Sequence, residues 1–115
     1  MVVDDDPNFL MLCEMQVKYF NLPVEVVSYS NPEFALDEIE KVSPDMLFLD
    51  INMPQTDGWA FLESIENRQL NTSIYIVTSS IDIYDQKRAM GHDIVNGFIS
   101  KPLDREKLKK VLSFN

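Results

Sequence analysis

Residues 46–58 read MLFLDINMPQTDG, a run of four apolar residues that ends in one acid, Asp50, and then breaks into turn residues. A short, continuous apolar run is typical of a parallel strand that is buried on both faces of its sheet. The turn residues behind the run would hold the Asp50 carboxylate at the edge of that sheet. The stretch therefore predicts a buried strand that presents a single acid at its end.

Three further apolar segments end in polar residues: the acid pair Asp4 and Asp5, the hydroxyl residue Thr78, and the base Lys101. In an open parallel sheet, ligands bind outside the carboxyl ends of the strands. We therefore expect these side chains and Asp50 to meet at one edge of the sheet.

Strand-like and helix-like segments alternate five times along the chain. We expect strands at residues 1–3, 24–29, 46–49, 74–77 and 97–100. Capping signals predict helix starts at Asp6-Pro7, Asn31-Pro32 and Asp104. Two more helices are expected, one that starts at Asp57 or Gly58 and one from Asp82 to Met90. Gly91 should end the fourth helix, and Glu25 favours an edge position for the second strand. This alternation implies an α/β fold with a parallel sheet between two layers of helices.

Size and charge narrow the function classes. The 115 residues predict one domain, 1–115, and the formal net charge of -9 argues against nucleic acid or an anionic membrane as a direct partner. No apolar run is long enough to span a bilayer or to export the chain. The single cysteine, Cys13, fits a reducing cytoplasm, and its apolar helical neighbours predict that it is buried. The segment 1–3 is short for a central strand, so we expect the strand to be truncated, with residues preceding Met1.

The predicted strand ends carry the residues that phosphoryl transfer needs. Three carboxylates held together repel one another unless a cation joins them, and Mg²⁺ prefers such oxygen ligands. Asp50, the isolated acid, is the natural nucleophile, whereas Asp4 and Asp5 form a pair suited to the metal. Lys101 and Thr78 could bind phosphoryl oxygens.

These motifs resemble the receiver domain of two-component response regulators. The resemblance covers essentially the whole chain and rests on Asp4-Asp5, Asp50 with Met53-Pro54, Asp57-Gly58, Thr78-Ser79 and Lys101-Pro102, in that order. It implies a doubly wound, flavodoxin-like sheet with the strand order 2-1-3-4-5.

The resemblance also implies a role for each site residue. Asp50 would accept a phosphoryl group from a sensor histidine kinase or a histidine phosphotransfer protein, and the domain would catalyse this transfer and its own dephosphorylation. Asp5, Asp50 and the Asn52 backbone carbonyl would bind Mg²⁺, with Asp4 holding a metal-bound water. Thr78 and Lys101 would bind the phosphoryl oxygens.

The resemblance places Phe98 at an aromatic switch position. Because its ring has no hydroxyl, any switch there must be steric. The switch would alter a surface formed by the last two helices and the strand between them, around Phe98, and this surface would contact an unknown downstream protein.

Other interpretations remain open from the sequence. A degenerate receiver would bind partners without phosphorylation. An aspartyl-nucleophile phosphatase would use Asp50 to attack a phosphorylated substrate. Such enzymes need an acid two residues after the nucleophile as a proton donor, and this chain has Asn52 there. A flavin-binding module is disfavoured because the acids after the first strand would repel a flavin phosphate. We expect Trp59 to be partly exposed, His92 to be exposed without a role, and Asn52 and Ser80 to tune hydrolysis of the acyl phosphate.

Overall fold

The computed structural model describes residues 1–53, 57–79 and 83–112, which form five strands and five helices in strict alternation. The elements are β1 (Val2–Val3), α1 (Pro7–Tyr19), β2 (Ser28–Tyr29), α2 (Pro32–Val42), β3 (Met46–Leu49), α3 (Gly58–Glu66), β4 (Ser73–Thr78), α4 (Ile83–Met90), β5 (Val95–Ser100) and α5 (Arg105–Leu112).

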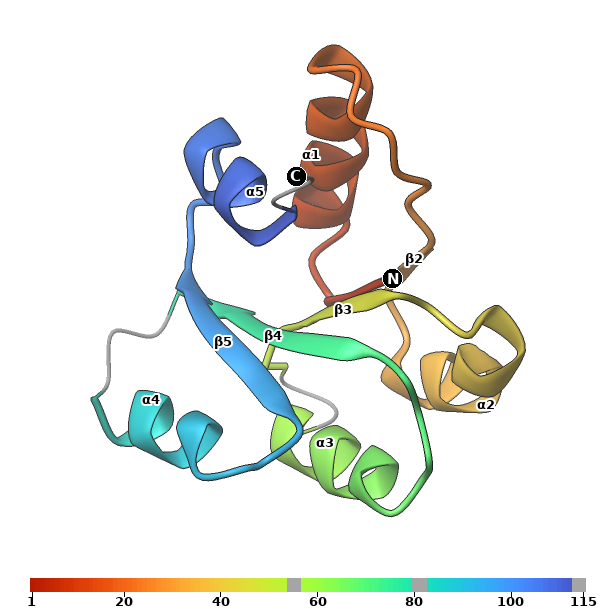
Figure 1. Cartoon of the computed structure of the whole chain (residues 1–115), viewed down its shortest axis with the longest axis vertical. Coiled ribbons are helices and arrows are strands. Elements are labelled where there is room, and N and C mark those ends of the chain that lie inside the picture. Colours follow the sequence, from red (N-terminus) through yellow and green to blue (C-terminus); the bar gives the residue numbers. More distant parts are fainter. Residues whose placement is uncertain (54–56, 80–82, 113–115) are drawn as a thin grey trace.

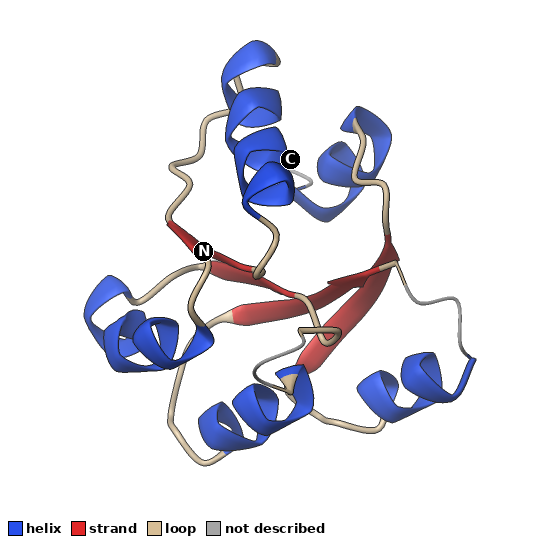
Figure 2. Ribbon diagram, turned by 180° about the vertical axis from the view of Figure 1, so that it is seen from behind, coloured by secondary structure: helices blue, strands red, loops and turns tan. Residues whose placement is uncertain are grey.

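All four pairings in the sheet are parallel, and the strand order is β2-β1-β3-β4-β5. This is the predicted doubly wound order. Helices α1 and α5 lie on one face of the sheet and α2, α3 and α4 on the other (Figure 1). Seen from behind, the sheet is a single layer between these two layers of helices (Figure 2).

Four predicted helix starts have the expected caps. The side chains of Asp6, Asn31 and Asp57 accept hydrogen bonds from backbone N–H groups of the first turns of α1, α2 and α3. Asp104 Oδ1 accepts one from the Lys107 N–H at 2.9 Å. Helix α4 ends at Met90, before Gly91, as predicted, whereas its expected first residue, Asp82, lies outside the described residues.

Two strand boundaries differ from the prediction by more than one residue. Residues 24–27 are not a strand, because β1 offers pairing partners only at Val2 and Val3, which face Ser28 and Tyr29. Strand β5 begins at Val95 rather than at Gly97. A bulge makes this longer strand possible: Ile74 faces Val95 and Tyr75 faces Gly97, while Asn96 Oδ1 accepts the Ile74 N–H at 2.9 Å.

The core consists of two apolar clusters, one on each face of the sheet. Strand residues alternate between them: Val3, Leu47 and Leu49 pack toward α2 and α3. Val2 and Phe48 pack instead toward α1 and α5, together with the buried thiol of Cys13. Both faces of the sheet are therefore covered, as the continuous apolar runs predict.

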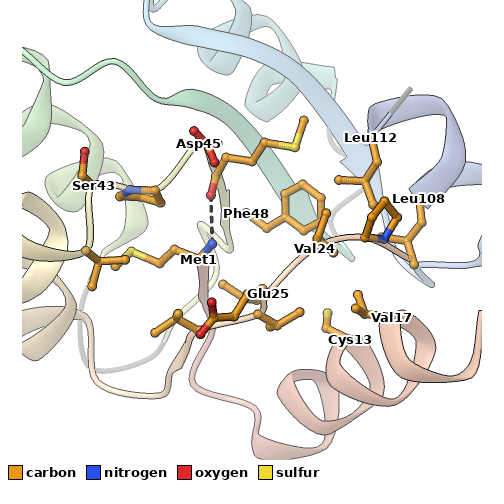
Figure 3. A pocket seen from close by; sticks show the side chains of 17 residues that line it. Met1, Cys13, Val17, Val24, Glu25, Ser43, Asp45, Phe48, Leu108 and Leu112 are labelled. Carbon is orange, nitrogen blue, oxygen red and sulfur yellow. Dashed lines mark hydrogen bonds between the residues drawn. The ribbon is translucent and has the colours of Figure 1, made fainter. Parts of the chain in front are cut away.

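A cavity of about 510 Å³ lies at the amino ends of β1 and β3 (Figure 3). Apolar side chains from α1 and α5 line it, including Val17 and Leu112, and Glu25 and Asp45 also contribute. The Met1 ammonium donates a hydrogen bond of 2.9 Å to the Met46 carbonyl there. The acids Asp4 and Asp50 follow the opposite ends of the same two strands, so the cavity is separate from the acidic edge.

Within the described ranges, no helix is long and apolar enough to cross a membrane.

Candidate functional site

The carboxyl ends of β1 and β3 bring the predicted acids together. Asp4 and Asp50 directly follow these neighbouring strands, and the Asp50 N–H donates to the Val3 carbonyl at 3.1 Å. Asp4 is 0% exposed and Asp50 is 6% exposed, while Asp5 faces solvent. One carboxylate oxygen from each of Asp4, Asp5 and Asp50 lies within 4.8 Å of the others. This donor set fits a hard divalent cation such as Mg²⁺, which takes carboxylate oxygens and retains several waters.

Lys101 supplies positive charge to these acids. It follows β5, and its Nζ donates hydrogen bonds to Asp4 Oδ2 at 2.7 Å and to Asp50 Oδ2 at 3.3 Å. The bond from Lys101 to the next residue, Pro102, is cis. The lysine therefore bridges both buried carboxylates, and its shorter bond is to Asp4.

Burial and the contacts between Asp4, Asp50 and Lys101 shift the pKa values of Asp4 and Lys101. Burial raises the pKa of the Asp4 carboxyl, and the nearby Asp50 charge raises it further, against the opposing hydrogen bond from Lys101. Burial by itself would lower the pKa of the Lys101 ammonium. The hydrogen bond to Asp4 and the charge of Asp50 outweigh burial, so the pKa of Lys101 is raised.

Backbone N–H groups orient both buried acids. Asn52 N–H donates to Asp50 Oδ1 at 2.9 Å, and Asp6 N–H donates to Asp4 Oδ1 at the same distance. Each carboxylate therefore has one oxygen bonded to the backbone two residues later and one facing Lys101. Such turns are a common use of aspartate behind a strand.

Thr78 lies at the end of β4 and is fully buried. Its carbonyl accepts the Lys101 N–H at 2.9 Å, and its hydroxyl oxygen accepts the Asn52 side-chain amide at 2.8 Å. Thr78 is thus tied to the lysine by its backbone and to the Asp50 segment by its side chain. The structure brings all the predicted strand-end residues to one edge of the sheet.

Gly58 keeps α3 close to Asp50. A Cβ at this position would lie 2.4 Å from Ile51 Cα and 2.5 Å from the Asp50 carbonyl oxygen. Only glycine permits this approach, which places the first turn of α3 against the backbone of the acid. The expected motif residue Pro54 lies outside the described residues, as does Ser80.

Two expectations about aromatic and histidine exposure are wrong. Trp59 is 6% exposed, because its ring stacks on His92 with centroids 5.9 Å apart and the Arg88 guanidinium lies 4.5 Å from its centroid. His92 Nδ1 contacts Glu66, so His92 links the loop after α4 to α3 instead of facing solvent. More than 20 positions of sequence separate Trp59 and Glu66 from Arg88 and His92, so only the packing of α4 on α3 reveals the group.

Phe98 is partly buried on β5 and packs against the cluster between the sheet and helices α2, α3 and α4.

One residue near the site, Phe9, was not predicted from the sequence. The ring of Phe9, on α1, lies beneath the Lys101 ammonium, with Nζ 4.2 Å from its centroid. Sequence periodicity indicates that Phe9 is a core residue but cannot indicate what its ring faces.

Comparison with known proteins agrees with this arrangement. The model of the response regulator receiver domain family matches residues 1–113. The transcriptional regulatory protein TrcR of Mycobacterium tuberculosis is 28% identical over 108 residues, which are 94% of this chain and 41% of the relative. The two-component response regulator ARR22 of Arabidopsis thaliana is 26% identical over 113 residues, which are 98% of this chain and 80% of the relative. The chain spans about half the length of several curated relatives.

Solved structures share the fold. A two-component response regulator from Cytophaga hutchinsonii superposes with a TM-score of 0.87 at 23% identity, covering 97% of this chain and 91% of that one. The chemotaxis response regulator CheY4 of Vibrio cholerae has a TM-score of 0.85 at 22% identity, covering 97% and 92%. The family match over nearly the whole chain, together with the acids, threonine and lysine at the strand ends, shows that this chain belongs to the response regulator receiver domain family.

Proposed function

We propose that Asp50 is the phosphoacceptor of a two-component system. The observation that carries the proposal is the environment of its carboxylate: it is buried, fixed by the Asn52 N–H, and 3.3 Å from the Lys101 ammonium. Phosphoryl transfer depends mainly on positioning and on charge stabilisation, and these contacts supply both.

The donor would be a phosphohistidine of a sensor kinase or of a phosphotransfer protein. A carboxylate oxygen of Asp50 forms the new O–P bond as the P–N bond of the donor breaks. The electron pair of that bond stays on the imidazole nitrogen, which then takes up a proton. Water later attacks the acyl phosphate, which releases inorganic phosphate and restores the Asp50 carboxylate.

Asp5, Asp50 and the backbone carbonyl of Asn52 would hold Mg²⁺, and Asp4 would hold a water bound to it. The ion, when bound, supplies positive charge for the carboxylates and for the phosphoryl oxygens. The side chains of Lys101 and Thr78 would donate to those oxygens, Lys101 as an ammonium and Thr78 as a hydroxyl. We place this chemistry in the cytoplasm, in keeping with the single cysteine of the chain.

Phosphorylation would favour one of two conformations of the domain rather than create a new one. Movement of Thr78 would make room for the Phe98 ring, which is partly buried two residues before Ser100, the strand partner of Thr78. The surface formed by α4, β5 and α5 would then contact a downstream protein.

The test uses Mg²⁺ and beryllofluoride, which mimics a phosphoryl group, on the wild-type protein and on Asp50→Asn. Calorimetry should give a saturable, Mg²⁺-dependent beryllofluoride complex that the variant lacks. Trp59 emission is a second signal, because Trp59 follows Gly58, where an added Cβ would overlap the Asp50 carbonyl oxygen.

A chemical donor extends the test to covalent transfer. Phosphoramidate carries a P–N bond, and intact-mass analysis should detect one phosphoryl group on the wild type and none on Asp50→Asn. Modification of the variant at another residue would refute the assignment of Asp50. Absence of both the complex and the modification in the wild type would instead indicate a receiver that works without phosphorylation.

A further inference from the structure

Phe9 lies at the junction of α1 and the site. It is the first buried residue of α1 and is 7% exposed. Its side chain belongs to the apolar cluster between the sheet and the helices α1 and α5. At the same time its ring faces the ammonium of Lys101, with Nζ 4.2 Å from the ring centroid.

Among the described residues, the ammonium therefore contacts one side chain from each of three separate parts of the fold. Asp4, after β1, accepts a hydrogen bond at 2.7 Å, and Asp50, after β3, accepts one at 3.3 Å. The Phe9 ring of α1 is the third. The Lys101 side chain is 18% exposed, so water screens these contacts little.

An aromatic face attracts a cation in a way that an aliphatic side chain of similar size does not. Leucine could fill much of the space of Phe9 and support the carbon chain of the lysine, but it has no negative ring face for the ammonium. The hydrogen bonds set the distance from Nζ to each carboxylate, and the ring face restricts the direction from which the ammonium approaches them.

We propose that Phe9 is a positioning residue for phosphoryl transfer: its ring holds the Lys101 ammonium at the Asp50 carboxylate through a cation–π contact. This inference rests on the proposed function of Asp50. Phe9 acts only through Lys101 and needs no contact with the phosphoryl group.

The first measurement reads the contact itself, in the metal-free protein. Protons above an aromatic face resonate upfield, so the ε-methylene protons of Lys101 should show this shift in the NMR spectrum of the wild type. Phe9→Leu should abolish the shift and Phe9→Tyr should keep it. Phe48→Leu is the matched control, because Phe48 is also 7% exposed and lies in the same cluster, with its ring against Tyr75.

The second measurement is beryllofluoride affinity at saturating Mg²⁺. Phe9→Leu should weaken binding by about 3- to 10-fold, the range of a partly desolvated cation–π contact. The beryllofluoride affinity of Phe9→Tyr and of Phe48→Leu should stay within about 2-fold of the wild-type affinity. If Phe9→Leu does not fold, Phe9→Met replaces it, since methionine also fills the space without a ring.

Two results would overturn the inference. One is an unchanged Lys101 shift in Phe9→Leu, and the other is an equal loss of affinity in Phe48→Leu, which would reduce Phe9 to a packing role. Failure of the proposed function gives a different pattern: the wild type itself would bind no beryllofluoride. The NMR comparison would then still decide whether Phe9 positions the ammonium.

Discussion

The side-chain amide of Asn52 donates a hydrogen bond of 2.8 Å to the hydroxyl oxygen of Thr78. The bond joins the segment behind β3 to the end of β4. Asn52 also donates its backbone N–H to Asp50, so one residue contacts both the acid and the hydroxyl of the site. The amide thereby fixes the orientation of a fully buried side chain.

Replacing Asn52 by alanine should remove one hydrogen bond from the side chain of Thr78. The buried hydroxyl oxygen loses a donor, so the free energy of unfolding should fall by about 1 kcal/mol, measured by urea denaturation. Scalar couplings of the Thr78 side chain should differ from those of the wild type. Asn71→Ala, at an exposed position before β4, is the control and should change neither quantity. An unchanged free energy of unfolding in Asn52→Ala would contradict the expectation.

Gly58→Ala should destabilise the protein and disturb the site. The added methyl group would overlap backbone atoms at 2.4 and 2.5 Å, which cannot rotate away, so we expect a loss of about 3 kcal/mol or more. Gly91 is the matched control, since a Cβ there would lie 3.4 Å from its nearest neighbour. Gly91→Ala should be neutral or slightly stabilising by thermal unfolding. Equal effects at the two glycines would show that the close approach of α3 to Asp50 is not required.

Asp4 should make stability depend on pH in the metal-free protein. Its pKa is raised by burial, so the folded state keeps the Asp4 proton to a higher pH than the unfolded chain does. The resulting stability is complete below the unfolded value of about 3.9 and is lost as pH rises through the raised folded value. Denaturation in a chelating buffer should show that Asp4→Asn gains stability relative to the wild type as pH rises from 4 to 7. The exposed Asp93, changed to asparagine, should follow the wild-type profile.

Cys13 should be inert in the folded protein. It is 2% exposed, and burial raises the pKa of its thiol to about 12. Because the thiolate is the reactive form, iodoacetamide should label Cys13 only after denaturation. Labelling of the native protein at the rate of the denatured chain would refute this expectation.

The same thiol should affect stability at alkaline pH. The unfolded chain releases the Cys13 proton from its ordinary value of 9.0, whereas the folded state keeps it to about 12. The free energy of unfolding therefore falls as pH rises through this window, because unfolding then releases about one proton. Comparison of urea denaturation curves for the wild type and Cys13→Ala should show the extra slope in the wild type alone.

The sequence predicts the architecture well because its signals are local. Apolar runs and capping residues such as Asn31 and Asp104 determine where elements start. The strand order, which the family resemblance implied, is also confirmed. The prediction of a strand at residues 24–27 was wrong because pairing depends on how much of β1 is available, which is a property of another segment.

The location of the site could be predicted from the sequence, but most contacts within it could not. The edge at which Asp50 and Lys101 meet follows from the rule for parallel sheets, and the structure brings them within hydrogen-bonding distance. The contacts of individual side chains cannot be predicted from this rule, because they depend on the packing of residues that are far apart in the sequence. Phe9 beneath Lys101 and the group around Trp59 are examples. The functional roles of the site residues stay predictions until they are tested with phosphoryl donors.

The bulge at Asn96 changes which side chains of β5 lie on the same face of the sheet. In a regular strand, residues three apart point to opposite sides, yet Val95 and Phe98 both pack toward α2, α3 and α4 while Ile99 packs toward α1 and α5. The bulge takes up Asn96 as an extra residue, so Val95 and Phe98 lie on the same side of the sheet although they are three positions apart. If all six residues paired regularly, Val95 could stay in place only if Phe98 turned toward α1 and α5. The face on which Phe98, the proposed switch residue, lies therefore depends on how the strand pairs at its opposite end.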